Sequence, residues 1–133
     1  LGFPQAHSGM PGVETSLPLM LTHAAAGRCS VPDVVGWMCE GPAQVYGMTG
    51  KGKLAEGMDA DLVLVDMESH REFRDTDTWT RVGWTALDRM SLTGWPMLTI
   101  VDGVVVHSRD SSGELRGNAV AAPGSTGRAL EFS

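Results

Sequence analysis

Histidine, cysteine and carboxylate side chains are this chain's candidates for metal binding and proton transfer. The four histidines are His7, His23, His70 and His107. None belongs to an HxH or HxxxH pair, and the two cysteines, Cys29 and Cys39, lack the CxxC spacing of a zinc site. The sequence therefore predicts neither a metal site nor a catalytic residue within its 133 residues.

Among the charged residues, Asp59 and Asp61 have the spacing of a carboxylate pair for acid–base catalysis. They stand at the entry to a predicted strand, however, where we expect them to fix a turn and to accept backbone N–H groups. Glu14 is a lone carboxylate before a helix, where a capping or dipole partner is more common than a catalyst. Lys51 and Lys53 are expected to be solvated turn charges, because the segment around them lacks the spacing of a phosphate-binding loop.

Two helices are predicted to position the N-terminal half of these residues. The first follows a Gly- and Pro-rich loop, is capped by Thr15 or Ser16, and is stopped by Gly27. The second begins with Ser30 as its N-cap and is predicted to end at Gly41, after which Pro42 starts a short third turn that runs to Gly47. Apolar residues recur at helical spacing in both segments, which predicts that each buries one face.

The C-terminal half has the pattern of a small sheet. Residues 61–66 read DLVLVD, which is typical of a short buried strand. Residues 98–107 contain the Asp102-Gly103 pair between two apolar runs, which predicts a hairpin with a type I′ turn. Residues 67–95 are polar, so we expect irregular structure there. The expected packing anchors of that stretch are Trp79, Trp84 and Trp95.

The chain thus divides into a helical part (residues 1–50), a β-rich part (residues 51–110) and a flexible Gly-, Ser- and Ala-rich tail (residues 111–133). So few strands leave open sheet edges, which predicts that the sheet is completed by strands from elsewhere. The sequence begins at Leu1 rather than at a methionine, which fits an origin in a longer reading frame.

Composition excludes some classes of partner. The chain is 42% hydrophobic, enough for a packed core, and its net charge of −6 argues against nucleic acid as a partner. No apolar run approaches the roughly 20 residues of a membrane-spanning helix. Two free thiols with no disulfide between them suit a cytoplasmic protein.

Two motifs resemble a known family. The first is SGMPGVET at residues 8–15 followed by LPL at residues 17–19, and the second is GKGKLAEGMDADLVLVD at residues 50–66. Together with GWT at residues 83–85, they make the chain similar to the C-terminal portion of dihydroorotases, the cyclic amidohydrolases of the amidohydrolase superfamily. After GWT the chain has Ala86 and Leu87, where relatives often have proline and an aromatic residue.

This resemblance implies an α/β fold that combines the last helices of a (β/α)₈ barrel with part of a small accessory β-sandwich. It implies a zinc-dependent parent enzyme that interconverts N-carbamoyl-L-aspartate and L-dihydroorotate in pyrimidine biosynthesis, with its metal ligands upstream of Leu1. Ser8 and Gly9 match the loop that presents backbone groups to the cyclic amide substrate. His7, beside them, is expected to be a solvated loop histidine. The chain alone is expected to bind no zinc and to be inactive.

The implied partners are the substrate, the rest of the barrel, and either a second copy or an aspartate carbamoyltransferase. Three alternatives remain open. The parent could be a hydantoinase or allantoinase, which differs in its upstream ligands and substrate arginine, although the resemblance of the GVET-x-LPL segment at residues 12–19 favours a dihydroorotase. It could be a non-catalytic homologue that acts as a scaffold. The chain could also be an independent β-rich module, although its unpaired strand edges argue against that.

Overall fold

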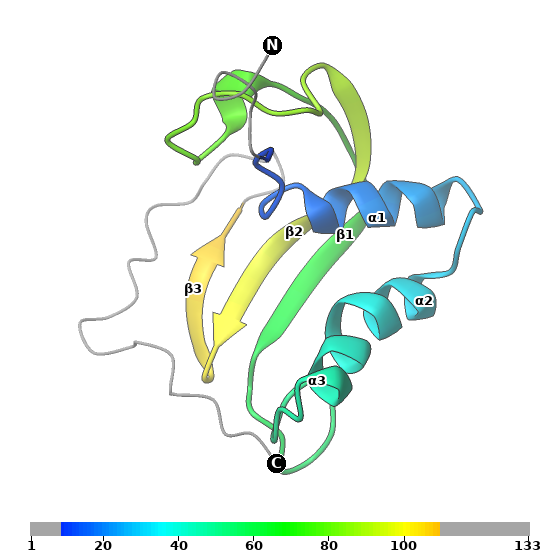
Figure 1. Cartoon of the computed structure of the whole chain (residues 1–133), viewed down its shortest axis with the longest axis vertical. Coiled ribbons are helices and arrows are strands. Elements are labelled where there is room, and N and C mark those ends of the chain that lie inside the picture. Colours follow the sequence, from blue (N-terminus) through cyan, green and yellow to red (C-terminus); the bar gives the residue numbers. More distant parts are fainter. Residues whose placement is uncertain (1–8, 110–133) are drawn as a thin grey trace.

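The computed structural model describes residues 9–109, in which a helical segment is followed by a three-stranded antiparallel sheet in the order β1-β2-β3 (Figure 1). The helical elements are α1 (Ser16–Ala25), α2 (Val31–Val35), the π-helical turn η1 (Gly36–Glu40) and α3 (Gly41–Val45). The strands are β1 (Leu62–Phe73), β2 (Met90–Val101) and β3 (Val104–Ser108), and the 3₁₀ turn η2 (Asp75–Asp77) follows β1. The predicted tail lies outside the described residues.

Helix α1 has the predicted bounds. Thr15 is its N-cap residue, but the Thr15 hydroxyl donates backwards to the carbonyl of Gly12 at 3.4 Å rather than capping the helix. Pro18 in the first turn is buried, and Gly27 follows the helix with a φ of +71°. That left-handed conformation is the one in which glycine commonly terminates a helix.

The second helical segment starts as predicted but does not end at Gly41. Ser30 and Asp33 form a capping box: the Ser30 hydroxyl accepts the Asp33 N–H, and the Asp33 carboxylate accepts the Ser30 N–H at 2.7 Å. Gly41 is itself helical with a φ of −59°, and its N–H donates to the Gly36 carbonyl, five residues back. This wide turn accommodates Pro42, which has no N–H and would crowd the preceding turn of a regular α-helix.

Strands β1 and β2 extend into the stretch that was expected to be irregular, so that prediction is wrong for residues 67–73 and 90–95. The sequence of β1 is polar there, yet from Glu68 to Phe73 its side chains alternate between more and less exposed. Antiparallel pairing with β2, not apolar composition, therefore maintains this half of the strand. The predicted hairpin turn is confirmed, since Asp102 and Gly103 have φ values of +49° and +78°.

Helix α1 packs across the middle of β2, where the β1–β2 pairing is interrupted between Asp66 and His70. Gly94 lies at this irregularity with a φ of +84°. The Thr22 hydroxyl accepts the Thr93 N–H at 2.8 Å and lies 3.3 Å from the Thr93 carbonyl. These contacts join the helical part to the sheet.

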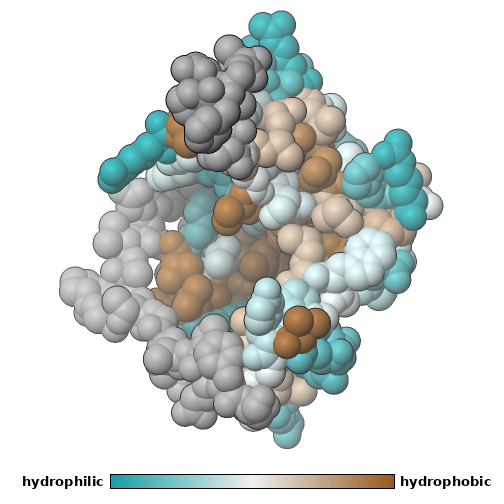
Figure 2. Space-filling view, in the orientation of Figure 1, coloured by the Kyte–Doolittle hydropathy of each residue, from teal (hydrophilic) through white to brown (hydrophobic). Residues whose placement is uncertain are grey.

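The core of the described residues lies beside this junction. Phe73, Leu92 and Trp95 are buried together, with Leu19 and Leu87 packed against them. Trp95 is therefore one of the three packing anchors that the sequence predicted, and Trp84 is half-buried. Trp79 is 62% exposed in the described part of the chain, so the same prediction is wrong for Trp79. Figure 2 shows that one face of the molecule is hollowed, with hydrophobic side chains visible inside the hollow.

Candidate functional site

The loop that the resemblance assigns to substrate binding is described from Gly9 onward. Ser8 and His7 lie outside the described residues. Gly9 and Met10 are exposed, and a Cβ atom placed on Gly9 would meet nothing within 4 Å. The backbone at Gly9 is therefore accessible to a ligand, as a glycine at a site of close backbone approach should be.

A tight turn anchors this loop to α1. The Gly12 carbonyl accepts the N–H groups of Thr15 at 3.2 Å and Ser16 at 2.9 Å. Thr15 is only 3% exposed. The end of the loop is thus fixed to the helix, whereas Gly9 and Met10 at its described start are exposed.

Glu14 links this turn to the loop between β1 and β2. The two oxygens of its carboxylate lie 3.0 and 3.1 Å from the Trp79 backbone nitrogen, whose N–H they accept. Glu14 is therefore bonded to a distant loop rather than capping α1. The sequence could not identify this contact, because the two residues are 65 positions apart.

A cleft of about 340 Å³ lies where the two loops meet. The loop before α1 provides one wall and the loop after β1 provides the other. Its lining residues are Pro11, Gly12, Val13, Glu14, Thr15, Thr78, Trp79, Thr80 and Thr85. The backbone groups and threonine hydroxyls in these walls could form hydrogen bonds with a small polar ligand.

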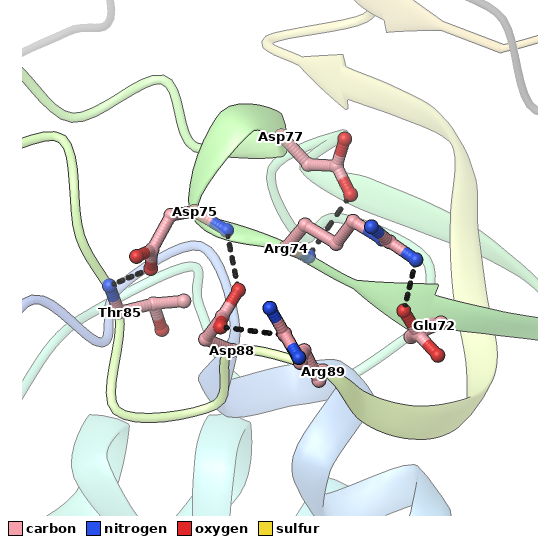
Figure 3. A network of polar contacts seen from close by, with 7 residues as sticks. All are labelled: Glu72, Arg74, Asp75, Asp77, Thr85, Asp88 and Arg89. Atoms are coloured by element: carbon pink, nitrogen blue, oxygen red, sulfur yellow. Dashed lines mark hydrogen bonds and ion pairs between the residues drawn. The ribbon is translucent and has the colours of Figure 1, made fainter.

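The loop after β1 is held in shape by the polar network drawn in Figure 3. Asp75 is at its centre: its backbone N–H donates to the Asp88 carboxylate at 3.0 Å, and its own carboxylate accepts the Thr85 N–H at 2.7 Å. The Thr78 hydroxyl donates to the Asp75 carbonyl at 2.7 Å. Trp79 follows directly, so its N–H is presented to Glu14 from a constrained backbone.

A second cleft, of about 310 Å³, continues from Glu14 towards the sheet. It contains His107 and Arg109, and the Arg109 guanidinium lies 5.8 Å from the centroid of Trp95. Burial, reinforced by the nearby Arg109, lowers the pKa of His107. Burial also lowers the pKa of Arg109, as does the positive charge of Arg71, whose guanidinium is 4.8 Å from the same ring.

The Asp59 and Asp61 pair has the structural role that the sequence predicted. The Asp61 carboxylate accepts the Asp102 N–H at 2.8 Å, which ties the strand entry to the hairpin turn. Lys51 is not a solvated turn charge, because its ammonium group pairs with both aspartates, 3.0 Å from Asp59. The Asp61 and Asp59 carboxylates raise the pKa of Lys51. Lys53 fits the prediction better, with an exposed side chain that reaches Glu40 at 3.0 Å.

The described residues do not fit a metal site. Among residues 9–109, no three His, Cys, Asp or Glu side chains converge in a way that could hold an ion. His23 contacts Arg28, His70 contacts Thr93 and His107 contacts Arg109, so the described histidines are dispersed. Both cysteines are free thiols in the described part of the chain, with Cys29 half-buried and Cys39 exposed. No helix in this part of the chain has the length and apolar character needed to cross a membrane.

Comparisons with known proteins identify the family of this chain. The chain belongs to the amidohydrolase family, whose model matches residues 10–106. It is similar to dihydroorotases: the enzyme of Methanothermobacter thermautotrophicus is 37% identical over 105 residues, or 79% of this chain and 24% of that protein. The dihydroorotase of Halobacterium salinarum is 39% identical over 115 residues, or 86% of this chain and 27% of that protein.

Hydantoinases are similar to a comparable degree. The L-hydantoinase of Paenarthrobacter aurescens is 39% identical over 107 residues, or 79% of this chain and 23% of that protein. The solved structure of an L-hydantoinase (dihydropyrimidinase) from Arthrobacter aurescens superimposes with a TM-score of 0.76 at 37% identity, covering 85% of this chain and 25% of that one. The chain spans about a quarter of the length of the curated relatives that it matches.

Proposed function

We propose that this chain is part of a cyclic amidohydrolase of the dihydroorotase type. The whole protein would interconvert N-carbamoyl-L-aspartate and L-dihydroorotate in pyrimidine biosynthesis, in the cytoplasm and with zinc. The observation that carries this proposal is the similarity to dihydroorotases over 79–86% of the chain, at 37–39% identity. The exposed glycine loop before α1 provides a place where such an enzyme could contact its substrate.

Within that protein, residues 1–50 would be the last loop and helices of a (β/α)₈ barrel and residues 51–110 part of an accessory β-sandwich. The zinc ligands would come from outside residues 9–109, in which no three His, Cys, Asp or Glu side chains converge. Ser8 and Gly9 would contact the cyclic amide through their backbone groups. The rest of the barrel would be an obligatory partner, and a second copy or an aspartate carbamoyltransferase a further one. The chain by itself would be inactive.

The second candidate is a hydantoinase, favoured by the 39% identity to an L-hydantoinase. The GVET motif separates the two less well than its sequence suggests. Glu14 bonds to the loop after β1, and Thr15 is buried at the start of α1, so both have structural roles. Allantoinase activity and a non-catalytic scaffold are further alternatives.

Two measurements separate these possibilities. The first is the coding sequence upstream of Leu1, where an HxH pair and two further histidines in frame would support a zinc enzyme and their absence would support the scaffold. The second is the activity of the whole purified protein on dihydroorotate, on 5-substituted hydantoins and on allantoin. Opening of dihydroorotate supports the proposal, whereas opening of hydantoins alone would refute it in favour of the second candidate.

The substrate contact can be tested at Gly9. The Gly9→Ala variant adds a methyl group into open space, so the fold should be unaffected. If the backbone at Gly9 approaches the substrate ring, that methyl group should raise the KM about tenfold or more. The Gly36→Ala variant is a matched control, since its Cβ also meets nothing within 4 Å but lies in η1. Equal KM values for the two variants would exclude the contact.

A further inference from the structure

Glu14 joins two loops that are far apart in the sequence, the loop before α1 and the loop after β1. Its carboxylate is shared by both clefts, and the backbone N–H that it accepts belongs to Trp79 in the loop after β1. A carboxylate acceptor makes a stronger hydrogen bond than a neutral one. Both oxygens are at hydrogen-bonding distance from the same nitrogen, so the bond tolerates small rotations of the carboxylate.

We propose that Glu14 is a positioning residue for cyclic amide binding: by holding Trp79, it fixes the direction in which residues 9–13 leave α1. This inference rests on the proposed function, in which the loop at Ser8 and Gly9 contacts the substrate. Glu14 itself need not touch the substrate.

The path from Glu14 to the predicted contact is short and stiff. The Gly12 carbonyl is bonded to the N–H groups of Thr15 and Ser16, so the turn around Glu14 cannot shift alone. Pro11, whose ring fixes φ, precedes Gly12. A displacement of the turn is therefore transmitted to Gly9 rather than absorbed along the loop.

The other side of the contact is equally constrained. The Thr78 N–H and hydroxyl both bond to the Asp75 carbonyl, at 3.2 and 2.7 Å. Asp75 is fixed in turn by its bonds to Asp88 and Thr85 (Figure 3). Trp79 thus provides a rigid support, which is what a positioning residue needs if it is to transmit geometry.

The test uses the whole protein with variants at both ends of the contact. Glu14→Ala removes the acceptor, and Glu14→Gln retains an oxygen but not the charge. Glu56→Ala is the matched control, because Glu56 is an exposed glutamate in a loop away from both clefts. Trp79→Ala keeps the backbone N–H, whereas Trp79→Pro removes it. The backbone should tolerate the proline, because the preceding residue, Thr78, is extended with a ψ of 137°.

The first readout is the separation of KM from kcat on whichever cyclic amide the wild-type protein opens. We expect Glu14→Ala to raise the KM about tenfold with a smaller change in kcat, and Glu14→Gln to restore part of the loss. Trp79→Pro should raise the KM similarly, and combining it with Glu14→Ala should add little. The inference would be overturned if the KM of Glu14→Ala equalled that of the Glu56→Ala control. It would also be overturned if the effects of Glu14→Ala and Trp79→Pro were strictly additive.

The second readout requires no turnover, so it separates this inference from the proposed function. Amide hydrogen exchange in the unliganded protein should accelerate in Glu14→Ala at Trp79 and at Thr15 and Ser16, whose N–H groups hold the turn, and it should remain unchanged in the core of β2. A protein that opens hydantoins instead of dihydroorotate would refute the dihydroorotase proposal but not this one. Exchange at Thr15 and Ser16 equal to wild type would refute the positioning role whatever the substrate.

Discussion

Replacing Gly94 by alanine should destabilise the sheet, at its junction with α1, more than the same replacement of Gly103 in the hairpin turn. Gly94 has a φ of +84°, and a Cβ atom there would lie 2.7 Å from the Leu21 Cβ atom and 3.3 Å from the Met67 sulfur. Real Cβ atoms do not approach another carbon so closely, so α1 would have to move away from the strand. Gly103 offers a matched control, because its φ is +78° but its nearest neighbour is the Ala60 Cβ atom at 3.9 Å.

The two variants separate backbone strain from crowding. A non-glycine residue with positive φ costs about 1–2 kcal/mol, and this term applies to both positions. Overpacking adds about 1–3 kcal/mol at Gly94 alone, because Leu21 belongs to the buried face of α1. We therefore expect a loss of about 3 kcal/mol for Gly94→Ala and about 1 kcal/mol for Gly103→Ala.

Native-state hydrogen exchange of the β2 amides measures this difference directly, because the free energy of local opening falls by the cost of the substitution. A loss of about 3 kcal/mol corresponds to exchange that is more than a hundredfold faster. Gly103→Ala should accelerate exchange only about fivefold. Equal acceleration in the two variants would refute the steric reasoning and leave only the backbone term.

Three further predictions follow from named contacts. Thr22→Val should cost about 1–2 kcal/mol and selectively accelerate exchange of the Thr93 amide, because it leaves that N–H without its acceptor; an unchanged rate would contradict it. Lys51→Met should destabilise the hairpin by no more than about 1 kcal/mol. Because the pKa of Lys51 is raised in the fold, its contribution is complete below the ordinary value of 10.5 and is lost as the pH rises through the raised value. Thermal melts across alkaline pH should therefore show a loss of stability that the variant lacks. Ser30→Ala should cost about 1 kcal/mol in the stability of α2, measured by exchange of its first amides against wild type.

Local chemistry explains most of the elements that the sequence predicted. The Asp102-Gly103 turn and the capping box at Ser30 depend on residues within three positions of each other, and both are present. The end at Gly41 was wrong because the rule that glycine stops a helix is also local. Here the next residue is Pro42, and a wide turn that only a small residue permits lets the helix continue: a Cβ atom on Gly41 would lie 2.9 Å from the Gly36 carbonyl oxygen.

Contacts between distant segments could not be predicted in the same way. The polar half of β1 is a strand because β2 pairs with it, and nothing in its composition indicates that partner. The contact of Glu14 with Trp79 uses a backbone donor, which any residue type would provide, so no sequence pattern could reveal it. The predicted substrate contact at Ser8 and Gly9 came from resemblance alone, and it stays a prediction.

The π-helical turn also sets which side of the helix faces inward. Val34 and Ala43 are both buried, at 1% and 7% exposure. They are nine residues apart, which is about two and a half turns of a regular α-helix, so a regular helix would place them on opposite sides. The extra residue in η1 removes roughly a quarter of a turn of winding, so both can contribute to one buried surface. Gly52 packs there so closely that a Cβ atom would lie 2.6 Å from the Ala43 Cβ atom. Deleting one residue from Gly36–Glu40 would restore the regular winding and rotate α3 relative to α2. Ala43 would then turn away from Gly52, and α3 would lose its contact with the segment that leads into the sheet.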